Sequence, residues 1–192
     1  MEAFLISTGV VALAEIGDKT QLLALVLAAK YRKPLPIILG ILVATLVNHA
    51  LAGAAGAWIS AQVGPQVMRW VLGLSFIALA VWTLIPDKYD DDDDNHATTS
   101  KLGVFGATLV AFFLLEMGDK TQIATVALAA KFDSLVGVVA GTTLGMMLAN
   151  VPAVLLGEVA AKKLPMHIVH RVAAAIFFVL GVTVLLGYGQ LG

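Results

Sequence analysis

The sequence predicts an all-α membrane protein with six transmembrane helices, arranged as two inverted three-helix repeats. Three observations predict this fold class. First, the 192 residues are 59% hydrophobic and only 13% charged, whereas a soluble domain is nearer half apolar and a quarter charged. Second, the apolar residues gather in six long stretches, each close to the ~20 residues that cross a bilayer as a helix. Third, one heptapeptide pattern occurs twice, identical at six of seven positions and 101 residues apart, beginning at Glu15 and at Glu116.

Turn-forming and charged residues bound the six expected spans. Basic residues and Pro34 follow the first span, Gly64 and Pro65 separate the second from the third, and Pro86 ends the third. Pro152 predicts a kink in the fifth span. We expect the spans at roughly 3–29, 36–61, 67–85, 102–130, 135–160 and 168–187.

A hydrophilic segment between the third and fourth spans divides the chain. It contains five consecutive aspartates, Asp90 to Asp94, and too little apolar surface to fold on its own. We therefore divide the chain into a first repeat (1–86), an acidic linker (87–100) and a second repeat (101–192). Because each half has an odd number of spans, the two halves must enter the membrane from opposite sides.

The lysine and arginine residues of the loops predict the orientation, since basic loops stay in the cytoplasm. Eight of them lie on the side that includes the acidic linker: Lys30, Arg32, Lys33, Lys88, Lys101, Lys162, Lys163 and Arg171. The other side has two, Arg69 and Lys131. We therefore expect a cytoplasmic linker and both termini outside.

The composition also bounds the partners. The net charge of −1 gives no indication of a nucleic-acid partner, and the expected partner is the lipid bilayer. The absence of cysteine excludes disulfides, thiolate metal sites and cysteine nucleophiles. A monomer and a homodimer are both compatible with the sequence, and no cofactor is expected.

The two heptapeptides, EIGDKTQ and EMGDKTQ, place charged residues inside the first and fourth spans, where charge is costly and usually functional. On a helix this spacing puts Glu15, Asp18 and Gln21 on one face. The corresponding residues of the second copy are Glu116, Asp119 and Gln122. Lys19 and Lys120 each follow a motif glutamate by four residues, the favourable order for a helical ion pair. Alternatively, the lysines point away and stabilise the fold.

A glycine lies between the two acids of each motif, at Gly17 and Gly118. Glycine weakens a helix, and a broken transmembrane helix frees backbone carbonyl oxygens that can add to a site.

Inverted repeats bring equivalent motifs together near the bilayer midplane. The expected site therefore combines the four acids, Glu15, Asp18, Glu116 and Asp119, with Gln21 and Gln122 nearby. Two amides in the second and fifth spans, Asn48 and Asn150, are placed to line the same cavity, and Met117 adds a soft ligand. Apart from that sulfur, the ligands are oxygens, which hard divalent cations such as Ca²⁺, Mg²⁺ and Mn²⁺ prefer.

The formal charges of this site indicate a mechanism. Four carboxylates and two lysines sum to −2, which either one divalent cation or two protons would neutralise. Clustered carboxylates in a low-dielectric site also favour protonation, so that protons compete with metal. The residues therefore predict cation/proton exchange.

The twin heptapeptides resemble the E-x-G-D-[KR]-[ST] motifs of a family of cation/proton exchangers that includes bacterial manganese exporters and Golgi Mn²⁺/Ca²⁺ transporters. The resemblance covers nearly the whole chain, with six spans, two repeats and an acidic central loop. It implies metal-site roles for the four acids, with support from Gln21, Gln122, Thr20 and Thr121. It also implies export of Mn²⁺ across the inner membrane of a bacterium, with Ca²⁺ as a second transported ion.

Other interpretations of the same residues remain open at this point. A Ca²⁺/H⁺ exchanger would share the architecture, and the four acids would alternatively form structural ion pairs with the lysines. An intramembrane aspartyl protease would use Asp18 and Asp119 as a proton-sharing pair, but it would not need the glutamates, so an enzyme is not expected. His49 is expected to be structural, and His170 to lie at the membrane interface.

Overall fold

The computed structural model describes residues 1–85, 103–156 and 166–187. All regular structure in these ranges is α-helical, which confirms the predicted all-α class. The predicted acidic linker, 87–100, lies outside the described residues, as does the part of the fifth span beyond residue 156.

Four helices are long and apolar enough to cross a membrane: α3 (Pro34–Gln62), α4 (Pro65–Thr83), α7 (Leu135–Leu156) and, over His167–Leu185, α9 (Met166–Leu185). They coincide with four of the predicted spans. Pro34 and Pro65 stand in the first turns of α3 and α4, where a missing N–H costs nothing because no carbonyl would accept from it.

The first and fourth predicted spans are not continuous helices, and this corrects the expected alignment of acids on one helix face. The first span consists of α1 (Glu2–Glu15) and α2 (Lys19–Tyr31), and the fourth of α5 (Gly103–Glu116) and α6 (Lys120–Lys131). In both spans the backbone turns at the motif glycine, which has a left-handed φ of 86° at Gly17 and 78° at Gly118. Few other residues adopt this conformation without strain.

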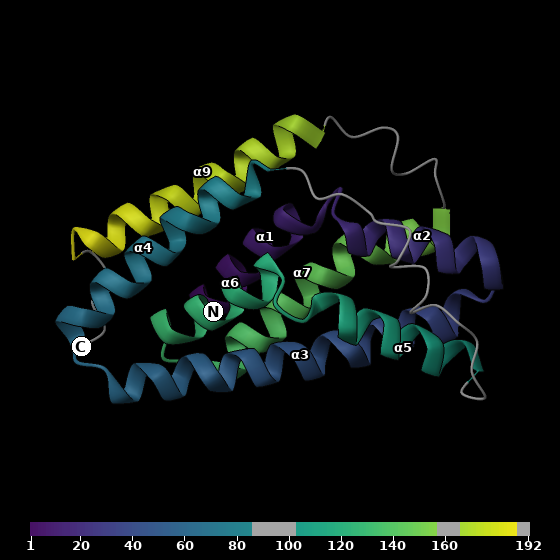
Figure 1. Cartoon of the computed structure of the whole chain (residues 1–192), viewed down its shortest axis with the longest axis horizontal. Coiled ribbons are helices and arrows are strands. Elements are labelled where there is room, and N and C mark those ends of the chain that lie inside the picture. Colours follow the sequence, from purple (N-terminus) through teal and green to yellow (C-terminus); the bar gives the residue numbers. More distant parts are fainter. Residues whose placement is uncertain (86–102, 157–165, 188–192) are drawn as a thin grey trace.

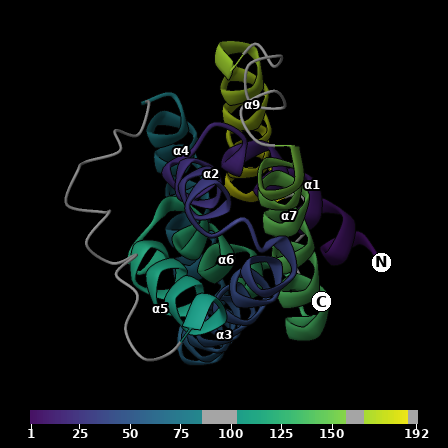
Figure 2. The same ribbon diagram turned by 90° about the vertical axis from the view of Figure 1, so that its right-hand side faces the viewer.

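The two halves are interlocked rather than side by side. The helix α1 of the first half packs on α7 of the second, and α5 of the second half packs on α3 of the first. Figure 1 shows α1, α6 and α7 in the middle of the molecule, α3 along one edge, and α4 and α9 as an outer pair. Figure 2 looks along the long axis and shows α1 beside α7 and α5 beside α3.

Equivalent glycines mediate these contacts reciprocally. A Cβ atom added to Gly141 would lie 2.5 Å from the carbonyl oxygen of Phe4, and one added to Gly40 would lie 2.9 Å from that of Phe105. Gly40 and Gly141 are 101 residues apart, as are Phe4 and Phe105. Small residues allow membrane helices to approach this closely. A reciprocal exchange of contacts is the pattern that a two-fold axis generates.

Candidate cation site

Both motifs form the same local structure, a helix that stops at a glutamate and restarts after an aspartate. Glu15 and Glu116 are the last residues of α1 and α5, and Asp18 and Asp119 are the N-caps of α2 and α6. Aspartate is a favoured N-cap because its carboxylate accepts from the free N–H groups of the first turn. Oδ1 of Asp18 accepts from the backbone N–H of Lys19 at 2.7 Å.

The motif glutamines close the two turns. The backbone N–H of Gly17 donates to Oε1 of Gln21 at 2.9 Å, and that of Gly118 donates to Oε1 of Gln122 at 2.7 Å. Nε2 of Gln21 also donates to the carbonyl oxygen of Ala149 in α7 at 3.0 Å. Gln21 therefore joins the break of the first half to the long helix of the second.

Acids from both breaks converge. Glu15, Asp18 and Asp119 each have a carboxylate oxygen within 4.8 Å of the other two. Their exposed fractions are 0%, 1% and 4%, so the cluster lies inside the protein. Glu116, the fourth motif acid, is also fully buried. The structure thus brings together three of the four acids that the sequence singled out, and it does so across the two halves.

The two carboxylate oxygens of each motif glutamate differ in their hydrogen bonding. The hydroxyl of Thr20 donates to Oε2 of Glu15 at 2.5 Å, and that of Thr121 donates to Oε2 of Glu116 at 3.2 Å. Within the described ranges, Oε1 of either glutamate accepts no hydrogen bond. Buried polar atoms seldom lack a partner, and a bound cation or a proton would provide one for the Oε1 atoms of both glutamates.

The lysines are paired across the two halves, which corrects the predicted pairing with the glutamate four residues earlier. Nζ of Lys19 lies 3.2 Å from Oδ1 of Asp119, and Nζ of Lys120 lies 3.4 Å from Oδ2 of Asp18. The four-residue rule requires an unbroken helix, and in each motif the helix is interrupted between the glutamate and the lysine.

The two asparagines are buried, but they are bonded differently. Nδ2 of Asn48 in α3 donates to the carbonyl oxygen of Phe113 in α5 at 3.1 Å, whereas Nδ2 of Asn150 donates to that of Met146 within α7 at 3.1 Å. No hydrogen bond to either Oδ1 is found in the part of the chain that the structure describes. Met117, for which a soft contact to the cation is predicted, is 55% exposed, whereas the four motif acids are buried.

Two partners of the site were missed from the sequence. One is the carbonyl of Ala149, which accepts from Gln21 as described above. The other is His170 in α9, whose Nε2 lies 3.0 Å from the carbonyl oxygen of Ile16. That carbonyl lies in the turn between α1 and α2, so His170 contacts the broken helix. Neither partner leaves a pattern in the sequence.

The arrangement is suited to binding a hard cation. The four acids and their polar neighbours offer only oxygen ligands near the cluster, which Mn²⁺, Mg²⁺ and Ca²⁺ accept and which softer metals accept less readily. Asp18 and Asp119 stand at the N-termini of α2 and α6, where the helix dipole favours negative charge.

Comparisons with known proteins agree with this chemistry. The family model "Divalent cation/proton antiporter GDT1" matches residues 3–91 and 104–190, one segment in each half. A protein of Vibrio cholerae serotype O1 named "Putative manganese exporter" is 50% identical over 181 residues, 94% of this chain and 88% of that protein. "GDT1-like protein sll0615" of Synechocystis sp. is 27% identical over 95% of this chain and 96% of its own length. "GDT1-like protein 5" of Arabidopsis thaliana is 25% identical over 97% of this chain and 96% of its own length. No solved structure matches.

The family match and the apolar helices together identify an integral membrane protein that is a transporter rather than an enzyme. They also confirm the resemblance inferred from the twin motifs. The chain belongs to the GDT1 family of divalent cation/proton antiporters.

Proposed function

We propose that this protein exports Mn²⁺ from the cytoplasm in exchange for protons, through one site built from both motifs. The observation that carries the proposal is the convergence of Glu15, Asp18 and Asp119, from two separate helix breaks, within 4.8 Å of one another. A site shared between two halves opens to alternate sides of a membrane when one half moves against the other.

In this proposal the halves are inverted three-helix repeats, 1–86 and 101–192, and the six crossings are α1 with α2, α3, α4, α5 with α6, α7, and α9. The reciprocal contacts of Gly40 and Gly141 support two-fold-related halves. The helix breaks lie near the middle of the long axis in Figure 1, which supports a site near the bilayer midplane. Both broken helices would cross with their charged turns inside the protein, where irregular backbone is tolerated.

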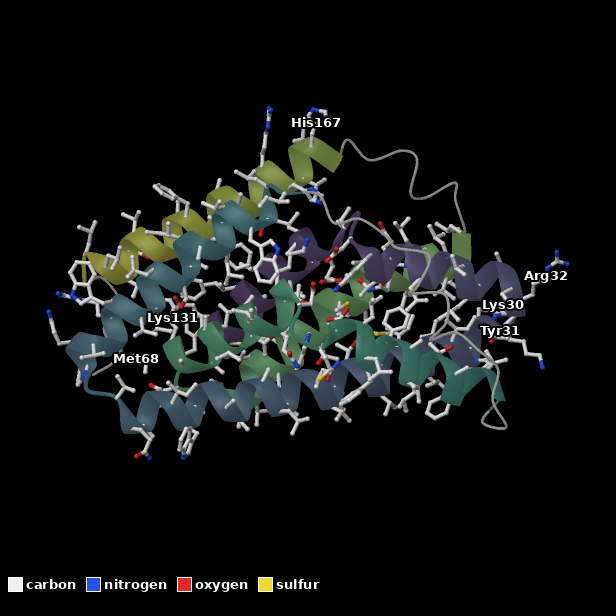
Figure 3. The ribbon with its side chains drawn as sticks, in the orientation of Figure 1. Lys30, Tyr31, Arg32, Met68, Lys131 and His167 are labelled. Atoms are coloured by element: carbon white, nitrogen blue, oxygen red, sulfur yellow. The ribbon has the colours of Figure 1, made fainter. Side chains whose placement is uncertain are left out.

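The orientation follows from the basic residues. Lys30 and Arg32 lie at one end of the molecule and Lys131 lies toward the other (Figure 3). We assign the end with Lys30 and Arg32 to the cytoplasm, together with the acidic linker, and both termini to the outside. A bacterial inner membrane is the location that the Vibrio relative supports.

Exchange follows from the balance of charge. Four buried acids and two lysines carry −2 when all are ionised, and one Mn²⁺ or two protons restores neutrality. Neutrality matters because net charge in a low-dielectric interior is costly. The metal-loaded and the proton-loaded states are therefore the two in which the site changes its access from one side of the membrane to the other. The metal and the protons consequently move in opposite directions.

Ca²⁺ is the second candidate substrate, because a site of oxygen ligands accepts it as readily as Mn²⁺. The name of the Vibrio relative favours Mn²⁺. Peptide hydrolysis by Asp18 and Asp119 is not proposed, because the family is one of transporters rather than enzymes.

The test is metal-driven proton flux in proteoliposomes that contain a pH-sensitive dye. Mn²⁺, and separately Ca²⁺, is added outside to the native protein, to Glu15→Gln and to Asp119→Asn. We expect a Mn²⁺-dependent pH change that both variants lose, one from each half. Glu2→Gln is the matched control, since Glu2 begins the same helix as Glu15 but is exposed. Metal entry without proton movement would refute exchange, and a larger response to Ca²⁺ would reverse the order of substrates.

A further inference from the structure

We propose that Lys19 and Lys120 are tethered counter-ions, which hold the aspartates of the empty site until the transported cation displaces them. The inference rests on the proposed function and assigns these two residues a positioning role in it. It concerns what the cation must displace rather than what binds it.

The geometry makes the arrangement reciprocal. Each half supplies one ammonium group to the aspartate of the other half, with Lys19 on Asp119 at 3.2 Å and Lys120 on Asp18 at 3.4 Å. Both aspartates belong to the group whose oxygens lie within 4.8 Å of one another. The ammonium groups therefore bind to two of the acids that a cation in this cluster would contact.

Simultaneous binding of a divalent cation and an ammonium group to these oxygens is energetically unfavourable. Two positive charges a few ångströms apart repel strongly in a buried site, where screening by water is weak. When Mn²⁺ binds, the lysines must therefore move off the aspartates. This displacement lowers the affinity of the site for metal, which aids release on the far side of the membrane.

The two bridges differ in accessibility. The side chain of Lys19 is 21% exposed, whereas that of Lys120 is 2% exposed. Lys120 is buried together with the aspartate that it contacts, whereas Lys19 is partly exposed to solvent. In this conformation the Lys19–Asp119 bridge is therefore the one that an entering cation opens first.

The chain contains no cysteine, so a single introduced thiol can be modified selectively. We would replace Lys19 by cysteine and measure Mn²⁺ binding to the purified protein by equilibrium dialysis. We expect Lys19→Cys to bind Mn²⁺ about tenfold more tightly than the native protein, because a competing positive charge has been removed. Its rate of Mn²⁺-driven proton flux is expected to fall, because the metal leaves more slowly.

Chemical restoration of the charge distinguishes a counter-ion from a structural contact. The thiolate of the Lys19→Cys variant attacks an aminoethyl thiosulfonate reagent, forms a disulfide with its aminoethylthio group and releases a sulfinate. The product carries an ammonium group at position 19 again, whereas a methyl thiosulfonate adds a neutral group by the same reaction. We expect the aminoethyl adduct to return the Mn²⁺ affinity to the native value, and the methyl adduct not to.

Lys30→Cys is the matched control, because Lys30 lies on the same helix but at the exposed end of the molecule (Figure 3). Neither this substitution nor its modification should change the Mn²⁺ affinity. Lys19→Arg, which keeps the charge, should also stay close to native affinity and tests whether a long cationic side chain suffices.

Weaker or unchanged Mn²⁺ binding in Lys19→Cys, with native binding intact, would overturn this inference alone. Recovery with the neutral adduct would do the same, since it would assign the effect to side-chain volume. A native protein that bound no Mn²⁺ would overturn the proposed function and this inference with it.

Discussion

The left-handed turn at Gly118 allows a prediction whose sign depends only on backbone conformation. Gly118 has a φ of 78°, and a Cβ atom added there would meet nothing within 4 Å. Substitution by alanine therefore introduces conformational strain without a steric clash. A left-handed residue with a Cβ costs about 1–2 kcal/mol, and the reduced freedom of the unfolded chain offsets about 0.5 kcal/mol of this. We expect Gly118→Ala to lower the free energy of unfolding by about 1 kcal/mol.

Gly9 provides the matched control. It also has nothing within 4 Å of an added Cβ, but it lies inside α1 with no left-handed backbone angle. Gly9→Ala should stabilise the protein by about 0.5–1 kcal/mol, because glycine is a poor helix former. Two substitutions that are chemically identical should thus have opposite signs.

Both variants can be measured by thermal unfolding in detergent, followed by circular dichroism. A change of about 1 kcal/mol corresponds to about 2–4 °C in the unfolding midpoint for a chain of this size. Gly118→Asn should fall between native and Gly118→Ala, since asparagine tolerates left-handed angles better. An increase in midpoint for Gly118→Ala would refute the broken helix at this position.

Two further predictions concern the contacts that hold the halves together. Gly56→Ala should destabilise the protein by about 1–3 kcal/mol, because its Cβ would clash with the backbone oxygen of Val126. Gly9→Ala, also inside a helix but with open space around the added Cβ, should not lower the unfolding midpoint, and equal midpoints for both variants would contradict the close approach of α3 and α6. Gln21→Leu leaves the amide of Gly17 and the carbonyl of Ala149 unpaired and should cost at least about 2 kcal/mol. Gln122→Leu breaks a bond at an exposed position and should cost less in the same assay, and the reverse order would contradict the assigned bonds.

The long helices and the convergence of three motif acids could be predicted well from the sequence, because both depend on strong local signals. Uninterrupted apolar stretches with Pro34 and Pro65 at their starts lead to α3 and α4 without tertiary information. The repeat of one motif at a fixed interval was enough to predict that Glu15 and Asp119, so far apart in the chain, come together.

The sequence did not predict which groups pair within the site. The assignment of Lys19 to Glu15 assumed an unbroken helix, and a glycine between them does not reveal whether the helix bends or stops. The break at Gly17 depends on side chains that compete for its backbone, such as Gln21, and on the contacts of the other half. His170 reaches Ile16 only because α9 folds back onto α1, which no local pattern encodes.

The exchange of partners between α1 and α7 has a consequence for biosynthesis. When α1 leaves the ribosome, the glycines that receive its backbone, Gly141 and Gly145, have not yet been made. The helix must therefore wait in the membrane, next to lipid or the insertion machinery, with the buried carboxyl group of Glu15 lacking its final surroundings until most of the chain has followed. Neither half can complete its own interior, so a nascent chain that stops after the first repeat should be a substrate for membrane proteases rather than a folded intermediate.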